Sequence, residues 1–137
     1  MSATQNLAYA VIQVVHNFGA VAAVGGSLAA TKSSSVDNRK KLAWLALAGW
    51  GTQGASGVAF GAVSYYFYHQ FPDISGIAVA ALVVKMACAA TGFLLLAVYL
   101  SRGGNWPEEK RSRAWFASST AFAVTALSAA AFLRWFS

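Results

Sequence analysis

Residues 75–100 read SGIAVAALVVKMACAATGFLLLAVYL, an apolar stretch with one charged residue, Lys85, near its middle. The apolar segment from Ile74 to Leu100 is long enough to cross a bilayer, whose hydrocarbon core of about 30 Å needs roughly 20 apolar residues. A charge at the centre of such a segment costs about 2.5–3.5 kcal/mol on membrane-insertion scales. We therefore expect Lys85 to have a partner, a water-lined cavity or a ligand, and to serve a function.

The composition of the whole chain indicates a membrane protein. Hydrophobic residues make up 58% of the 137 residues, and the charged residues, only 10%, are clustered rather than spread as on a soluble surface. We interpret residues 1–137 as one domain of the all-α membrane class, a bundle of four transmembrane helices. The helices are predicted at about residues 5–30, 42–68, 74–100 and 114–136.

The distribution of positive charge predicts the orientation of the bundle. Of the ten Lys and Arg residues, eight lie in the connectors 31–41 and 101–113, and the connector 70–75 contains none. Cytoplasmic loops carry the excess of Lys and Arg, so both termini are expected outside, with the chain in the inner (plasma) membrane of a bacterium. The net charge of +6 is then a topology signal, and we expect no nucleic-acid partner.

Three polar residues on three predicted helices lie at similar depth. With a rise of 1.5 Å per residue, His16 and Lys85 each lie roughly 13 Å from the outer boundary, and Gln53 lies about 16 Å from the inner one. All three therefore fall near the midplane of a core about 30 Å thick. We expect His16 and Lys85 to face the same cavity, with Gln53 close by.

The other small and polar residues of the helices have ordinary structural interpretations. Gly57 and Gly61 form a small-xxx-small pattern, which usually allows two membrane helices to approach closely. Ser118, Thr125 and Ser128 supply hydroxyls on a face that can point into the bundle, although such hydroxyls usually bond to carbonyls of their own helix. We therefore favour packing over function for these positions.

Histidine and cysteine give the candidate ligands. His16 is predicted to lie in the dry interior, where an imidazole is the commonest axial metal ligand, whereas His69 is predicted at the membrane surface as an anchor. Cys88 is the single cysteine, so it forms no intrachain disulfide and is interpreted as a small buried residue. The candidate site thus consists of His16 as metal ligand, His16, Lys85 and Gln53 as cofactor-binding residues, and Lys85 as catalytic group. Gln53 fits a bond between helices equally well.

The order of these residues resembles a known family. The segments VVHNFGAVAAVGG (14–26), NRKKLAWLALAGWGTQGASG (38–57) and AALVVKMACAATGFLLLAVYLSR (80–102) are similar to the membrane domain of the copper resistance protein D (CopD) type. The resemblance covers about residues 7–113 and depends on the order His16, Gly57, Lys85, Arg102. A related group, the four-helix protoporphyrinogen oxidases of the HemJ type, also has a His in its first helix and a Lys in its third.

The resemblance implies two kinds of cofactor. The HemJ-type group implies haem b or a porphyrin at His16, with Lys85 as a second ligand or as the partner of a carboxylate, for electron transfer or tetrapyrrole oxidation. The CopD type implies copper transport, for which the chain offers few soft ligands besides Met86 and Cys88. A third hypothesis is a non-catalytic subunit of a larger membrane complex. A homo-oligomer in which two copies of His16 share one iron is also open.

Overall fold

The computed structural model describes residues 2–70, 73–102 and 109–136, and within them the chain forms helices and no strand. In chain order the helices are α1 (Ala3–Lys32), α2 (Val36–Tyr68), α3 (Ile77–Ser101) and α4 (Glu109–Phe136). The predicted all-α class with four helices is therefore confirmed.

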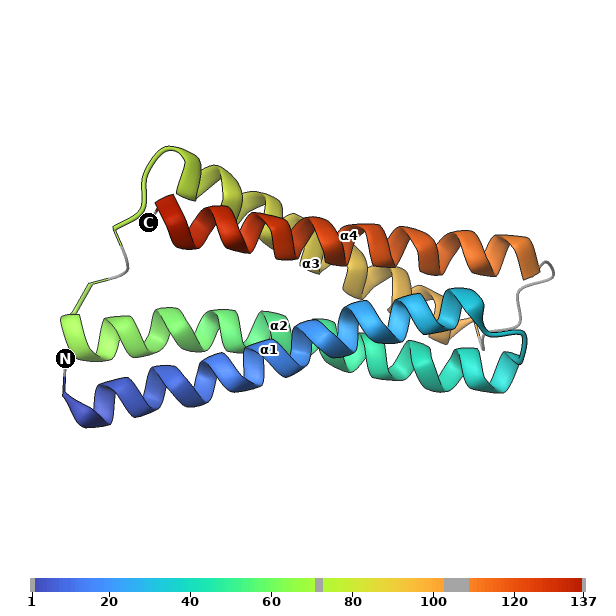
Figure 1. Cartoon of the computed structure of the whole chain (residues 1–137), viewed down its shortest axis with the longest axis horizontal. Coiled ribbons are helices and arrows are strands. Elements are labelled where there is room, and N and C mark those ends of the chain that lie inside the picture. The colour runs from blue at the N-terminus through green and yellow to red at the C-terminus, as the bar shows by residue number, and fades with distance from the viewer. Residues whose placement is uncertain (1, 71–72, 103–108, 137) are drawn as a thin grey trace.

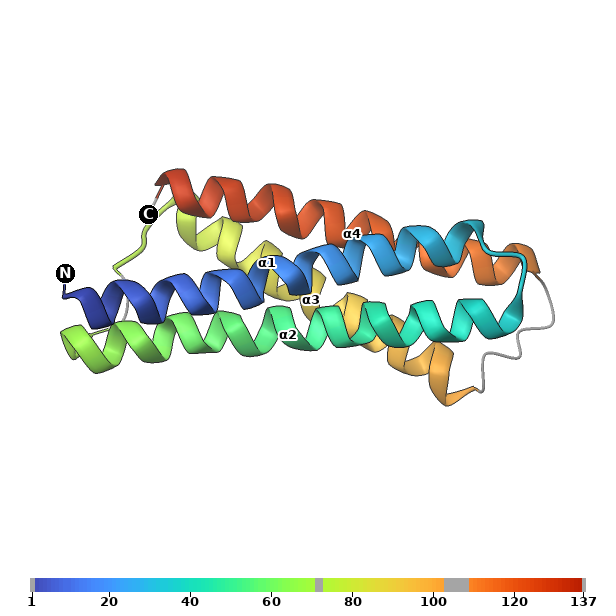
Figure 2. The ribbon, with the colours of Figure 1, turned by 60° about the horizontal axis from the view of Figure 1, so that its bottom comes forward.

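The four helices run antiparallel to their chain neighbours and form a bundle (Figures 1 and 2). Each helix packs against two others, in the ring order α1, α2, α3, α4, so that α1 lies diagonally opposite α3 and α2 lies opposite α4. Both chain termini lie at the end of the bundle where α2 gives way to α3, which we call the terminal end (Figure 1). The opposite end, where α2 and α4 begin, is called the basic end.

Two helices extend further toward the basic end than their apolar runs predict. α2 begins at Val36 rather than at residue 42, and α4 begins at Glu109 rather than at residue 114. At the start of α2 the hydroxyl of Ser35 accepts a hydrogen bond from the backbone N–H of Asn38 at 3.4 Å, which is an ordinary N-cap. Hydropathy identifies only the apolar part of a helix. In α2 and α4 a polar first turn precedes the apolar part, so both helices begin earlier than predicted.

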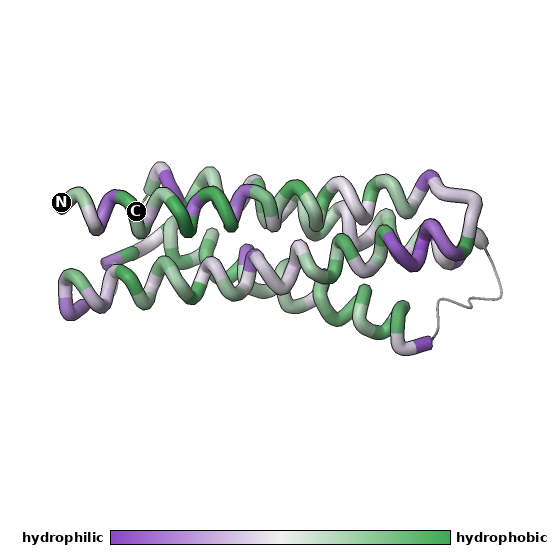
Figure 3. The backbone as a smooth tube through the Cα atoms, turned by 90° about the horizontal axis from the view of Figure 1, so that it is seen from below, coloured by the Kyte–Doolittle hydropathy of each residue, from purple (hydrophilic) through white to green (hydrophobic). Residues whose placement is uncertain are grey.

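Three of the helices, α1, α3 and α4, are long and apolar enough to cross a membrane. The chain is therefore a helical multi-pass membrane protein by length and composition. α2 is the longest of the four, but it contains no stretch that is apolar enough by the same criterion, because its middle, GTQGASG (51–57), is rich in glycine and polar residues. Figure 3 shows the hydrophobic character along the helices and the hydrophilic residues that gather toward the basic end.

Small residues form most of the interior of the bundle. The buried cluster combines alanines from α1, α2 and α4 with a few larger side chains, among them Trp50, Leu96, Tyr99 and Phe116. Many large aliphatic and aromatic side chains are instead exposed on the outer surface. This is the pattern of a bundle in lipid, where helices associate through close packing of small residues rather than through burial of large apolar ones.

Glycines set the closest helix contacts. A Cβ added at Gly49 of α2 would lie 2.4 Å from the backbone nitrogen of Ala23 in α1, and one at Gly92 of α3 would lie 2.4 Å from the Trp50 ring. By contrast, a Cβ at Gly54 or Gly57 would meet no atom within 4 Å. The interpretation of Gly57 as a packing glycine is therefore wrong, because α2 has no close neighbour on that side at this level.

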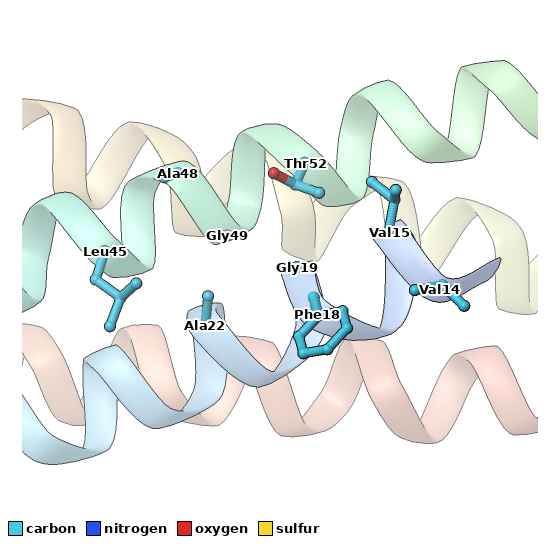
Figure 4. Close-up of a pocket in the computed structure, with 9 residues that line it drawn as sticks. All are labelled: Val14, Val15, Phe18, Gly19, Ala22, Leu45, Ala48, Gly49 and Thr52. Carbon is cyan, nitrogen blue, oxygen red and sulfur yellow. The ribbon is translucent and has the colours of Figure 1, made fainter. Parts of the chain in front are cut away.

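An apolar groove runs along the outside of the α1–α2 pair (Figure 4). It has a volume of about 280 Å³ and is lined by side chains that include Val15, Phe18 and Thr52, with Gly19 and Gly49 at its floor. Val15 and Phe18 are exposed, whereas His16 between them in the sequence is buried. The groove therefore opens on the outer surface of the bundle, and the imidazole does not line it.

Candidate functional site

His16 lies inside the bundle at the junction of three helices. Its side chain is 8% exposed, and both ring nitrogens have partners. Nδ1 lies 2.7 Å from the hydroxyl oxygen of Ser56 in α2, and Nε2 lies 3.0 Å from Nζ of Lys85 in α3. The ring of Phe60 meets the imidazole edge to face, with centroids 5.7 Å apart. The imidazole is thus held on both edges.

The hydrogen bonds around His16 assign its tautomer. The hydroxyl of Ser56 donates its proton to the backbone carbonyl of Thr52, so its oxygen accepts from Nδ1–H. Nε2 then carries the lone pair and accepts a hydrogen bond from the amine of Lys85. The nitrogen that points toward α3 is therefore the one able to bind a metal or to take up a proton.

Lys85 reaches His16 across the diagonal of the bundle, from α3 to α1, and its side chain is partly buried. The four acidic residues of the chain, Asp37, Asp73, Glu108 and Glu109, all lie near helix ends or in connectors. Among the residues that the structure describes, no carboxylate lies at the level of Lys85. The imidazole of His16 and the amine of Lys85 are thus two basic groups in contact in the interior, with no acidic residue beside them in the described part of the chain.

Gln53 completes the polar layer from α2. Its side-chain amide donates a hydrogen bond to the backbone carbonyl of His16. The structure therefore brings His16, Lys85 and Gln53 together, as their equal depth predicted. Gln53 contacts the backbone of α1 rather than the imidazole or the amine, an arrangement that suits a bond between helices.

One residue of the site, Ser56, was missed by sequence reasoning. It lies one helical turn from both Thr52 and Phe60, and its side chain is 4% exposed. The signal that could have found it is its spacing, because Ser56 follows Gln53 by three residues and shares its face of the helix.

The expectation that the hydroxyls of α4 can face the interior is wrong for the three residues named. Ser118, Thr125 and Ser128 are exposed, and Ser118 and Ser128 bond to carbonyls four residues earlier in their own helix at 3.0 Å. Ser119 of α4 does face the interior. Its oxygen lies 2.9 Å from that of Ser27 in α1 and accepts a hydrogen bond from the Trp50 indole at 3.5 Å.

The remaining candidate ligands lie apart from His16. His69 is exposed and forms the C-cap of α2 in a left-handed conformation with φ 56°, so it does not share the interior layer. Cys88 is buried and reduced. Among the residues that the structure describes, no three His, Cys, Asp or Glu side chains gather as they would around a metal ion held by protein ligands alone.

Comparison of the chain with protein-family models, with curated proteins and with solved structures finds no match. The CopD-like and HemJ-like resemblance therefore stays a prediction.

Proposed function

We propose that the bundle binds haem b or a porphyrin in the membrane interior, for electron transfer or tetrapyrrole oxidation. The observation that carries this proposal is the buried contact of His16 Nε2 with Lys85 Nζ at 3.0 Å. It pairs a group that binds iron with a group that binds a carboxylate. Both functions are needed for a macrocycle that carries a metal at its centre and acidic groups at its edge.

The hydrogen bonding of His16 supports the role of iron ligand. Metal-binding histidines usually donate their other ring N–H to a nearby acceptor, which fixes the tautomer and the ring orientation. Ser56 is such an acceptor for Nδ1–H, and the Nε2 lone pair is left facing the interior. Binding of a metal at Nε2 requires that Lys85 give up its hydrogen bond to that nitrogen.

Lys85 supports the recognition of an acidic group. An amine in the interior of a membrane protein requires a compensating partner, and the described part of the chain has no carboxylate at that level. A ligand carboxylate supplies the missing charge. The open sides of Gly54 and Gly57, where an added Cβ would meet no atom within 4 Å, leave room for a flat ligand beside this layer.

These contacts indicate a separate role for each residue of the site. When bound, the tetrapyrrole supplies the redox chemistry of its iron or its ring. His16 holds the metal, Ser56 orients His16, and Lys85 pairs with a carboxylate and can give up or accept a proton at Nζ. The surrounding apolar helices exclude water from these groups.

We further propose that α2 crosses the membrane with the other three helices, which gives four spans. The support is that α2 runs beside α1 and packs tightly against it along the bundle. The excess of Lys and Arg at one end favours a cytoplasmic location for the basic end and outward-facing termini, in the inner membrane of a bacterium.

The test is the absorption spectrum of the detergent-purified chain after expression with haem or porphyrin supplied. Wild type is expected to show the intense haem or porphyrin band, and His16→Ala to lose it. His69→Ala is the matched control, because it removes an exposed imidazole from the end of α2. We expect this variant to keep the band.

The contrary outcomes point to different functions. Equal loss of the band in His16→Ala and His69→Ala would contradict ligation at the interior layer. If wild type carries neither haem nor porphyrin but copurifies with copper, the copper-transport alternative replaces this proposal. If it carries none of the three, Lys85 is better explained by an acidic residue of a partner subunit.

A further inference from the structure

A second group of buried polar side chains lies at the basic end of the bundle, about four helical turns along α2 from Gln53. Arg39, in the first turn of α2, is only 6% exposed, although Arg is almost never fully buried unless it is paired. Its Nε and Nη1 atoms are buried, and within the described part of the chain neither has a hydrogen-bond partner. A buried guanidinium without hydrogen-bond partners carries a large desolvation penalty, which a bound anion would offset.

Ser112 of α4 has the same property. Its side chain is 3% exposed, and its hydroxyl oxygen is buried without a hydrogen-bond partner among the described residues. Arg39 lies one helical turn before Ala43, and Ser112 lies one turn before Phe116. Ala43 and Phe116 both belong to the buried core. Because α2 and α4 lie diagonally opposite each other, the two buried polar side chains flank the bundle interior from opposite corners, next to the same core.

The surroundings of Arg39 and Ser112 favour negative charge. Eight of the ten Lys and Arg residues of the chain lie in or beside the two connectors of this end, against three of the four acidic residues, so the end carries net positive charge. Asp37 is a nearby carboxylate, but it is exposed and lies two positions from Arg39, on another face of the helix. It therefore does not neutralise Arg39.

We propose that the basic end binds a phosphate group through Arg39 and Ser112. A phosphate offers several acceptor oxygens and a negative charge, which match the unpaired N–H groups of Arg39 and the hydroxyl of Ser112. Two sources can supply it, the headgroup of an anionic phospholipid or free phosphate. Basic pockets between membrane helices bind lipid headgroups in this way.

The test measures thermal unfolding of the full chain in detergent. Phosphatidylglycerol is added to one series and phosphatidylcholine to another, and sodium phosphate is compared with sodium chloride at equal ionic strength. The variants are Arg39→Gln, Ser112→Ala and Lys41→Gln. The last is the matched control, because it removes an exposed positive charge from the same helix.

We expect the Tm of wild type to rise by several degrees with phosphatidylglycerol and not with phosphatidylcholine. Arg39→Gln should abolish this rise, Ser112→Ala should reduce it, and Lys41→Gln should keep it. In neutral detergent Arg39→Gln should unfold at or above the wild-type Tm, because the substitution removes an unpaired buried charge. The order should reverse in phosphatidylglycerol. An equal rise with sodium phosphate would identify free phosphate as the source.

Two results would overturn the proposal. One is an equal response to phosphatidylglycerol in Arg39→Gln and Lys41→Gln, which would reduce the effect to general surface charge. The other is a lower Tm of Arg39→Gln in every condition, reproduced by Glu108→Gln or Glu109→Gln. Arg39 would then be paired with a carboxylate of its own chain.

Discussion

The position of His16 is determined by hydrogen bonds from three separate residues. Ser56 binds its Nδ1, Lys85 binds its Nε2, and Gln53 binds its backbone carbonyl. In a bilayer core each unsatisfied polar group costs several kcal/mol of free energy. The hydrogen bonds of His16 with Ser56, Lys85 and Gln53 therefore fix the positions of all four residues. Removing one partner therefore affects both the stability of the bundle and the chemistry of the imidazole.

Replacement of Ser56 by Ala should leave Nδ1–H of His16 without an acceptor. A buried unsatisfied donor costs about 1–3 kcal/mol, so the Tm in detergent should fall. Loss of such a partner also typically lowers metal affinity by roughly tenfold to a hundredfold, which a haem titration would detect. Ser118→Ala is the control, since the Ser118 hydroxyl is exposed and bonds to its own helix. It should change stability by less than about 0.5 kcal/mol.

Replacement of Lys85 by Met should preserve the fold and impair ligand binding. The change removes a hydrogen bond worth about 1 kcal/mol, but it also removes a charge from the membrane interior, and the two effects oppose each other. We expect nearly unchanged circular dichroism and Tm, together with a weaker or shifted haem or porphyrin band. A wild-type band in this variant would show that Lys85 does not contact the ligand.

At the scale of the helices, the glycines divide into two groups. Gly49 and Gly92 lie where neighbouring helices leave no room for a Cβ, whereas Gly54 and Gly57 lie beside open space. The same residue type therefore closes the bundle at one level of α2 and leaves it open at another. The change occurs next to Gln53, at the height of the His16–Lys85 pair.

Alanine substitutions should separate these two groups. Gly49→Ala places a Cβ 2.4 Å from the Ala23 backbone nitrogen and should destabilise the bundle by about 1–3 kcal/mol, since backbone cannot move aside cheaply. Gly57→Ala meets no atom and should be neutral or stabilising by up to about 1 kcal/mol, because Ala favours the helical state. Thermal unfolding of the two variants side by side checks this. A wild-type Tm for Gly49→Ala would contradict the tight contact of α1 with α2.

The sequence was sufficient for the helices and for the polar layer, but not for their contacts. Helix number follows from apolar length, and the meeting of His16 with Lys85 follows from equal depth. The starts of α2 and α4 could not be placed because polar turns leave no hydropathy signal. Ser56 and Ser119 could not be told from Ser118, because depth alone does not say how each helix is rotated in the bundle.

For the whole molecule, the distribution of charge predicts which side each end faces. In a Cys88→Ala background, Ser34→Cys at the basic end and Asp73→Cys at the terminal end each provide one exposed thiol. A membrane-impermeant maleimide should label Ser34→Cys only in inverted vesicles and Asp73→Cys only in right-side-out vesicles. Labelling of both from the same side would contradict a membrane-crossing α2.

The tight α1–α2 contact has a consequence for how the protein is made. α2 is the helix that falls short of the apolarity needed to enter a bilayer alone, and Gly49 of α2 fits closely against Ala23 of α1. During synthesis α1 leaves the ribosome before α2 and can stay at the translocon until α2 has been made. The two helices would then insert as one hairpin. A chain that starts after α1 should deliver α2 to the cytosol as a substrate for quality-control proteases, even though every residue of the later helices is intact.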